Sequence, residues 1–261
     1  MKTLFYIFFI GFSIQNAFGQ ITERKASLAL GGGIDLINNL DLATSPFSYQ
    51  GLGVPVGVNM LVMSENWINR FEATFILPLL TNNYALKSNA GTELKSWSKV
   101  RFNYQLLRSI DEKAINYVGG EIKLDFFLRE YQFLDGFGWE LQNSFNLDYA
   151  RLIHINNKSF ILSQFSFPIV GFIHRKPSLT LDEGFLKDLE YGRRGDLLNY
   201  GNWKLILDEW TAFELKILYH NQLNERFSFQ TQIGLNYYSI SYPEKVQNVN
   251  LPLICYLNYH F

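Results

Sequence analysis

Charged side chains recur at every second position in several apolar segments of this 261-residue chain. Glu121, Lys123 and Asp125 show the pattern most clearly, because they alternate with Ile122 and Leu124. Alternate side chains of a strand point to the same face, so these charges would share one face of a sheet. The residues expected on that face are Asp35, Glu72, Lys99, Arg101, Glu121, Lys123, Asp125, Arg129, Asp148, Glu214 and Lys216.

Two kinds of chemistry suit such a face if it lines the lumen of a barrel. One is an ion or proton path, and the other is a network of cross-strand ion pairs that plugs the lumen. The plug is the expected reading, because small barrels fill their interior with side chains and only much larger ones leave a wide pore. If a tight turn over residues 110–113 joins two neighbouring strands, Asp125 lies opposite Lys99.

Hydrolytic chemistry would need a base close to a nucleophile or an activated water. Three of the four histidines, His154, His220 and His260, fall near one end of the expected strands. His174 falls near the other end beside Arg175, where we expect it to meet solvent or phosphate groups. No nucleophile and base can be paired from the sequence. No catalytic residue is therefore assigned, and whether the protein is an enzyme is uncertain.

Small residues form another part of the inward-facing surface. We expect long charged side chains from the opposite wall to fill the room that they leave, and the alternative is a small ligand cavity. No GxGxxG spacing opens a helix here, so the glycines are not a phosphate-binding loop. The small residues are Ala29, Gly31, Gly33, Gly51, Gly53 and Gly57.

Ten segments with alternating apolar and polar residues are expected to form the strands that position these side chains. Connections after the second, fourth, sixth and eighth segments are short, and most of the others are longer, which is typical of outer-membrane barrels. Residues 203–210 either extend the eighth strand or add a hairpin, which would give twelve strands. The ten segments are 25–38, 47–63, 67–81, 98–109, 114–131, 139–155, 159–174, 210–220, 226–241 and 249–261.

Four prolines fall inside these segments, although proline removes a hydrogen bond from a sheet ladder. We expect β-bulges at Pro55, Pro78 and Pro168, whereas Pro252 lies near the start of its strand.

The last thirteen residues, 249–261, are apolar on one face, although Ile254 and Tyr256 blur the other. An apolar strand that ends in Phe resembles the closing strand of Gram-negative outer-membrane β-barrel proteins. The resemblance implies a location in the cell outer membrane, with outer-membrane lipid and lipopolysaccharide as surroundings. It also implies that Tyr259 and Phe261 form an assembly signal that the barrel assembly machinery reads.

The first residues have the layout of a secretory signal peptide. Lys2 precedes an apolar run over residues 4–14, and Ala17 and Gly19 are the small residues that a signal peptidase reads. The run is shorter than the ~20 residues that a membrane-spanning helix needs, which disfavours the alternative of an uncleaved anchor. We therefore expect a signal peptide over residues 1–19 and one barrel domain over residues 20–261.

Composition excludes several other classes of function. A formal net charge of −1 creates no long-range field to recruit nucleic acid. Cys255 is the only cysteine, so an internal disulfide and a cysteine-based zinc cluster are excluded, and no metal or cofactor is expected. Aromatic residues make up 16% of the chain, which suits the aromatic girdles of a membrane barrel.

The sequence thus predicts an all-β fold, namely a transmembrane antiparallel up-and-down β-barrel of about ten strands. A soluble barrel would show the same periodicity, but the loop asymmetry, the terminal Phe and the long strands favour the membrane. The expected role is structural or binding, through extracellular loops whose ligand is unknown. The alternatives are a narrow channel for a small solute and a rim-located hydrolase acting on lipid or peptide. Ten-stranded omptin proteases resemble the chain in strand number, but their paired Asp-Asp and Asp-His motifs have no counterpart here.

The longest connection, residues 175–209, has some order of its own. Thr180 and Glu183 are spaced as in a capping box, which predicts a short helix that ends at Gly192.

Overall fold

The structure is a computed structural model that describes residues 25–41, 48–64, 66–83, 94–131, 137–175, 202–206, 210–241 and 245–261. All described regular elements are antiparallel strands of one sheet, and no helix in these ranges is long and apolar enough to span a membrane. The strands are β1 (Lys25–Asp41), β2 (Ser48–Met63), β3 (Trp67–Asn83), β4 (Leu94–Ser109), β5 (Asn116–Tyr131), β6 (Phe137–Asn156), β7 (Ser159–Arg175), β8 (Asn202–Ile206), β9 (Trp210–Gln222), β10 (Phe227–Ile240) and β11 (Val246–His260).

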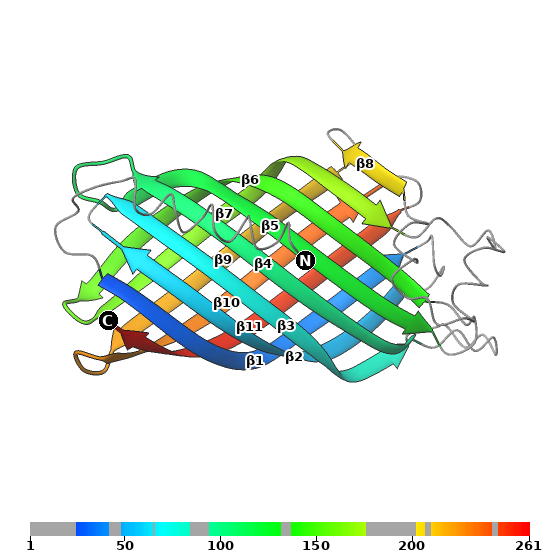
Figure 1. The fold of residues 1–261 in the computed structure, drawn as a ribbon, viewed down its shortest axis with the longest axis horizontal. Coiled ribbons are helices and arrows are strands. Elements are labelled where there is room, and N and C mark those ends of the chain that lie inside the picture. Colours follow the sequence, from blue (N-terminus) through cyan, green and yellow to red (C-terminus); the bar gives the residue numbers. More distant parts are fainter. Residues whose placement is uncertain are drawn as a thin grey trace, which may run out of the picture.

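Ten of these strands close into an up-and-down barrel (Figure 1). Each of the ten pairs with the next of the ten along the chain. β7 therefore pairs with β9, and it also pairs with the short strand β8. The barrel closes where β1 pairs with β11, from Ser27 opposite His260 to Asp41 opposite Val246. The prediction of a closed barrel of about ten strands is confirmed. We call the end where β1 begins and β11 ends the terminal end, and the opposite end the loop end.

The short strand β8 lies in the segment whose role the sequence left open. β7 pairs with β9 from Ser159 to Ser166 and with β8 from Gly171 to Arg175. Both pairings are antiparallel and use the same edge of β7, so β8 continues the line of β9 as a separate piece. The segment therefore extends the eighth predicted strand, and the alternative of twelve strands is wrong.

The outer surface of the barrel is apolar and the inner surface is largely polar. Burial alternates along the strands, as in β10, where every second residue is buried. Large apolar side chains are exposed on the outer face of every barrel strand, which is the reverse of a soluble protein. One from each is Leu30, Val56, Phe75, Phe102, Ile122, Phe145, Phe165, Ile217, Ile233 and Leu257.

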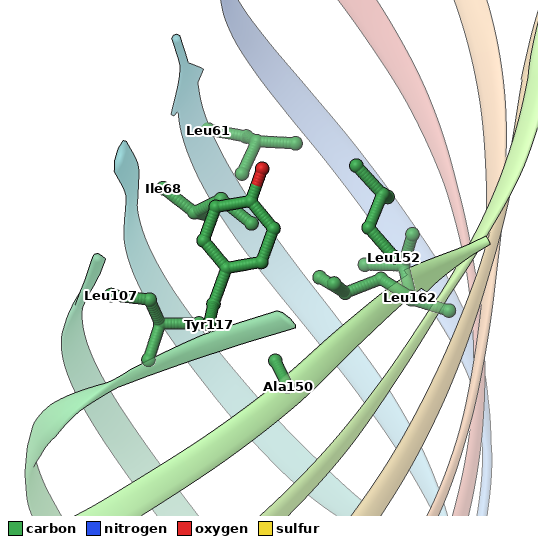
Figure 2. Packing of buried hydrophobic residues seen from close by; sticks show 8 residues of the cluster. Leu61, Ile68, Leu107, Tyr117, Ala150, Leu152 and Leu162 are labelled. Carbon is green, nitrogen blue, oxygen red and sulfur yellow. The ribbon is translucent and has the colours of Figure 1, made fainter. Parts of the chain in front are cut away.

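Apolar side chains also pack inside the barrel toward each of its two ends. Figure 2 shows those at the terminal end, where side chains from β2 to β7 and β9 pack inside the barrel. This terminal layer consists of Leu61, Ile68, Leu107, Tyr117, Ala150, Leu152, Leu162 and Leu218. Toward the loop end, two smaller clusters together form the loop-end layer, which consists of Ile37, Ile76, Trp97, Phe127, Ile173, Tyr238, Ile240 and Val246.

The glycine-rich wall accommodates an aromatic side chain from a neighbouring strand. A Cβ atom on Gly31 would lie 2.3 Å from Cδ1 of Tyr256, and one on Gly57 would lie 3.4 Å from its hydroxyl. Gly53 makes room for Trp97 in the same way. The expectation that charged side chains from the opposite wall fill this space is therefore wrong. Ile254 and Tyr256 blur the polar face of the last strand because both pack inside, against Ala29.

The prolines have two different effects on the ladders. The register shifts next to Pro78, between Leu52 and Gly53 on the paired strand, and next to Pro168, so both predicted bulges are present. At Pro55 the β1–β2 register resumes unchanged after a gap in pairing, so a bulge there is wrong. Pro252 lies beside a similar gap between β10 and β11. A missing N–H interrupts these two ladders without inserting a residue.

Candidate functional site

The structure gathers the predicted inward charges between the two apolar layers. Lys123 keeps 15% of its side chain exposed, and the side chain of Arg129 lies outside the described residues. The others are buried: Asp35, Glu72, Lys99, Arg101, Glu121, Asp125, Asp148, Glu214 and Lys216.

Asp125 of β5 binds two cations of β4. Nε of Arg101 lies 2.9 Å from Oδ1 of Asp125, and Nη2 lies 3.2 Å from Oδ2, so the contact is bidentate. Nζ of Lys99 lies 3.1 Å from Oδ2. Arg101 is the residue directly opposite Asp125, whereas Lys99 lies opposite Phe127. The predicted pairing of Lys99 directly opposite Asp125 is wrong by two residues.

The turn between β4 and β5 explains this shift. The carboxylate of Asp111 accepts hydrogen bonds from the backbone N–H groups of Ile115, at 2.8 Å, and Asn116, at 3.1 Å. The turn therefore lasts until Asn116, and Ser109 pairs with Tyr117. Desolvation opposes ionisation of Asp111, but these hydrogen bonds hold its pKa below the usual value. Because the shift is two residues, every side chain keeps its predicted face.

A second group of ion pairs crosses the lumen around Glu214 of β9. Lys123, on β5, forms an ion pair with Glu214, although β6 and β7 separate their strands on one side. Nζ of Lys216 lies 2.5 Å from Oε1 of Glu214 and 3.5 Å from Oε1 of Glu121. Opposite walls of the barrel are thus joined by direct contacts between charged groups.

Arg70 of β3 organises a third group that the sequence reading missed. Nη2 of Arg70 lies 3.0 Å from Oε2 of Glu72, and its Nε donates to Asn59. Arg70 also donates to Gln232 of β10, which again spans the lumen. The hydroxyl of Tyr256 donates to Oε1 of Glu72 over 3.1 Å. Arg70 could have been found, since it has the same parity as Glu72 in a predicted strand.

Ser166 of β7 lies between two carboxyl groups. Its Oγ is 3.3 Å from Oε2 of Glu121 and is also hydrogen-bonded to Oδ1 of Asp148. Nδ2 of Asn146 donates to Oε2 of Glu121 over 2.9 Å. Nε2 of Gln105 donates to Oδ2 of Asp148 over 2.7 Å.

Two further acidic groups lie nearer the loop end. Asp35 is buried on β1, where its backbone pairs with Pro252 and Gly53. Glu140 of β6, a buried acid that the sequence reading missed, accepts hydrogen bonds from Tyr238, at 2.6 Å, and Gln142, at 2.5 Å. Its parity matches that of Asp148 on the same strand.

A small polar cavity adjoins the network on its loop side. Its volume is about 40 Å³, and its lining includes Lys99, Arg101, Lys123, Glu214, Asn146 and Ser166. A cavity of this size, about 40 Å³, holds roughly three or four water molecules, at about 10–15 Å³ for each. Among the described residues, this part of the interior therefore holds fixed charges and a little water.

His174 does not occupy the exposed position expected for it. Its side chain is 2% exposed, and its ring centroid lies 4.5 Å from that of Trp139. The backbone of His174 pairs with Leu141, so alternation sets its side chain on the face opposite to Gln142. The expectation that His174 meets solvent or phosphate groups is therefore wrong.

Within the described ranges, no three His, Cys, Asp or Glu side chains gather as a metal site would require.

The sequence matches no protein-family model, and no curated protein is similar to it in sequence. Solved structures with a similar fold include the outer-membrane protease OmpT of Escherichia coli, with a TM-score of 0.44 and 8% identity over 91% of this chain and 96% of that one. The beta domain of the Bordetella autotransporter BrkA gives a TM-score of 0.40 and 10% identity over 92% and 99%. The translocator domain of the autotransporter NalP from Neisseria meningitidis gives 0.39 and 8% over 100% and 98%.

Proposed function

We propose that the chain is an outer-membrane β-barrel protein with a filled lumen, whose role is structural or binding through its extracellular loops. The observation that supports this most directly is the apolar outer surface, which every barrel strand contributes to, around a charged interior. In water this arrangement would be unfavourable, because it exposes apolar side chains and buries charged ones. In a bilayer it meets lipid outside and keeps charge away from hydrocarbon.

The length of the strands agrees with a membrane location. Barrel strands contain between 13 and 20 residues, whereas about 9 to 11 tilted residues cross the hydrocarbon core. Aromatic rings gather on the outer face at the terminal end, where Tyr259 lies between Phe227, at 5.6 Å, and Phe261, at 5.2 Å. Such rings favour the level of the lipid head groups. The proposed surroundings are therefore outer-membrane lipid and lipopolysaccharide, with the terminal end in the periplasm.

The filled interior favours a loop-based role over a narrow channel. Two apolar layers lie on either side of the charge network, and Lys123 binds Glu214 across the lumen. An ion that crossed the barrel would have to separate these pairs and pass both layers. The partners that the loops bind stay open, and the assembly role of Tyr259 and Phe261 stays a prediction.

Conductance measurements test the filled lumen. Purified protein reconstituted in a planar bilayer should give no discrete conductance steps, while a general porin in the same bilayer gives them. Regular steps from the wild-type protein would support the channel instead.

Membrane fractionation tests the location, because the protein should be recovered with outer membranes and should migrate differently in SDS before and after boiling. Recovery in the soluble periplasmic fraction would contradict the proposal.

A further inference from the structure

The hydroxyl group of Ser166 poses a problem of proton count. Its Oγ is within hydrogen-bond distance of Glu121 and of Asp148, and both are carboxyl groups. A hydroxyl has one hydrogen, so it donates to one acceptor only. If both carboxyls were ionised, one of the two contacts would place oxygen lone pairs against each other. A proton on one of the carboxyl groups turns that contact into a second hydrogen bond.

The neighbouring groups indicate which carboxyl holds this proton. Glu121 has a cation near it, since Nζ of Lys216 lies 3.5 Å from Oε1, and Asn146 donates to its other oxygen. The described partners of Asp148 are neutral, namely Ser166 and Gln105. A buried carboxylate without a cation is costly, whereas a protonated carboxyl is not. Glu121 is thus the better placed to carry the negative charge, and Asp148 is the better placed to hold the proton.

We propose that Asp148, Ser166 and Glu121 form a binding site for a single proton inside the barrel. Asp148 holds the proton on Oδ1 and donates it to Oγ of Ser166, and Ser166 donates to Oε2 of Glu121. Oδ2 of Asp148 then accepts from Gln105. Every hydrogen in this series of hydrogen bonds has one acceptor. The site as a whole carries a single negative charge beside Lys216.

Further observations point to a route by which the proton is exchanged. Ser166 of the site and the neighbouring Asn146, which binds Glu121, line the cavity of about 40 Å³, so water there can reach the hydroxyl of Ser166. Oδ1 of Asn146 and Oε1 of Gln105 are buried acceptors with no hydrogen-bond donor among the described residues. Their residues are 4% and 2% exposed, and both amides bind the carboxyl pair. The oxygen of Asn146, which lines the cavity, would accept from water that brings or removes the proton.

The two sides of the site differ. On the terminal side, Leu107, Tyr117 and Leu162 of the terminal layer separate it from the end of the barrel. On the loop side lies the polar cavity. We therefore expect the proton to exchange with the loop side, which would be the outside of the cell in the proposed orientation.

The charged and polar groups that face the site come from five strands. β4 supplies Gln105, and β5 supplies Glu121 with Lys123 behind it. β6 supplies Asp148 itself and Asn146, β7 supplies Ser166, and β9 supplies Lys216 and Glu214. Lys216 is shared between Glu121 and Glu214, so it does not neutralise a second carboxylate at the site.

Infrared spectroscopy of the purified barrel tests the proposal at neutral pH. The carbonyl stretch of a protonated carboxylic acid is separate from the amide bands and shifts in D₂O. The wild-type protein should show such a band, and Asp148→Asn should lower its intensity by the share of one carboxyl group. Asp111→Asn is the matched control, because it makes the same chemical change at an ionised carboxylate in a turn and should keep the band at full intensity. Ser166→Ala should keep the band and move it to higher frequency, since the hydrogen bond to Oγ is gone.

Three outcomes would overturn the proposal. They are a wild-type spectrum without the band, a band unchanged in both Asp148→Asn and Ser166→Ala, and a band weakened in Glu121→Gln but kept at full intensity in Asp148→Asn. If Asp148→Asn fails to fold, the frequency shift in Ser166→Ala decides the matter. This test does not involve the loops, so it is independent of the proposed loop function.

Discussion

Arg101 and Asp125 face each other directly on β4 and β5 and share two hydrogen bonds, of 2.9 and 3.2 Å. Both are buried, and Lys99 contacts the same carboxylate. Removing Asp125 would leave two cations unpaired in the interior.

We predict that Asp125→Ala lowers the free energy of unfolding by ~3 to 5 kcal/mol, as breaking a buried ion pair does. A triple variant, Lys99→Met, Arg101→Met and Asp125→Leu, removes all three charges and should lie much closer to the wild type. Urea unfolding in detergent, followed by the SDS migration shift, measures both. A triple variant that is less stable than Asp125→Ala would contradict the charge-balance argument.

Gly31 is predicted to be intolerant of a methyl group, because its Cβ would lie 2.3 Å from the ring of Tyr256 and 2.6 Å from the carbonyl oxygen of Cys255. Gly31→Ala should cost about 1 to 3 kcal/mol, the range for overpacking. Gly32→Ala is the matched control, since a Cβ atom there would lie at an ordinary 3.5 Å from the carbonyl oxygen of Pro55. Thermal unfolding of the two variants compares them. Equal losses of stability would show that Tyr256 does not occupy the glycine wall.

The Asp111 turn should lose stability in acid. Hydrogen bonds from Ile115 and Asn116 hold the pKa of Asp111 below its unfolded value, so its contribution is present above about pH 4. That contribution disappears as the pH falls through the lower, folded-state pKa. Asp111→Asn should thus be less stable than the wild type at neutral pH, and the two should converge in acid. Unfolding midpoints measured across this range test the sign, and a difference that grows in acid would refute it.

Deleting Phe261 should reduce the amount of protein inserted more than it reduces stability. The ring is 79% exposed and contacts Tyr259, so its burial contributes at most the ~1.5 to 3 kcal/mol of one apolar side chain. Quantitative blotting of membranes measures insertion, and thermal unfolding measures the inserted fraction. Normal insertion with a much lower melting temperature would make Phe261 a structural residue and no assembly signal.

Trypsin distinguishes the two ends of the barrel. Lys158 lies in an exposed turn between β6 and β7 at the terminal end, so intact cells should protect it. The pair Arg193-Arg194 lies outside the described residues, in a connection at the loop end, and should be cut in intact cells. Mass spectrometry of the fragments identifies each site. Cleavage after Lys158 in intact cells would mean that the proposed orientation is reversed.

The sequence predicted which face of the sheet a side chain lies on far better than which side chains are in contact. Alternation alone placed Glu121 and Asp125 inside, because a strand has a strict period of two. It did not give the register, since that depends on how Asp111 binds the backbone of the turn. It also missed the terminal layer, because inward residues such as Leu107 and Leu162 look like irregularities until neighbouring strands bring them together. The sequence reading missed Arg70, although it lies two residues before Glu72 in the same predicted strand and therefore points to the same face.

The Tyr256 side chain also provides a check on how the barrel closes. Gly31 lies on the first strand and Tyr256 on the last, so their contact can form only when the whole circle is complete. A slip of one residue along this seam would turn Tyr256 outward and bring Cys255 or Leu257 inside. Neither side chain has a ring to fill the glycine wall or a hydroxyl to reach Glu72. The contacts of Tyr256 with Gly31 and Glu72 thus mark the correct register at the seam that closes the barrel.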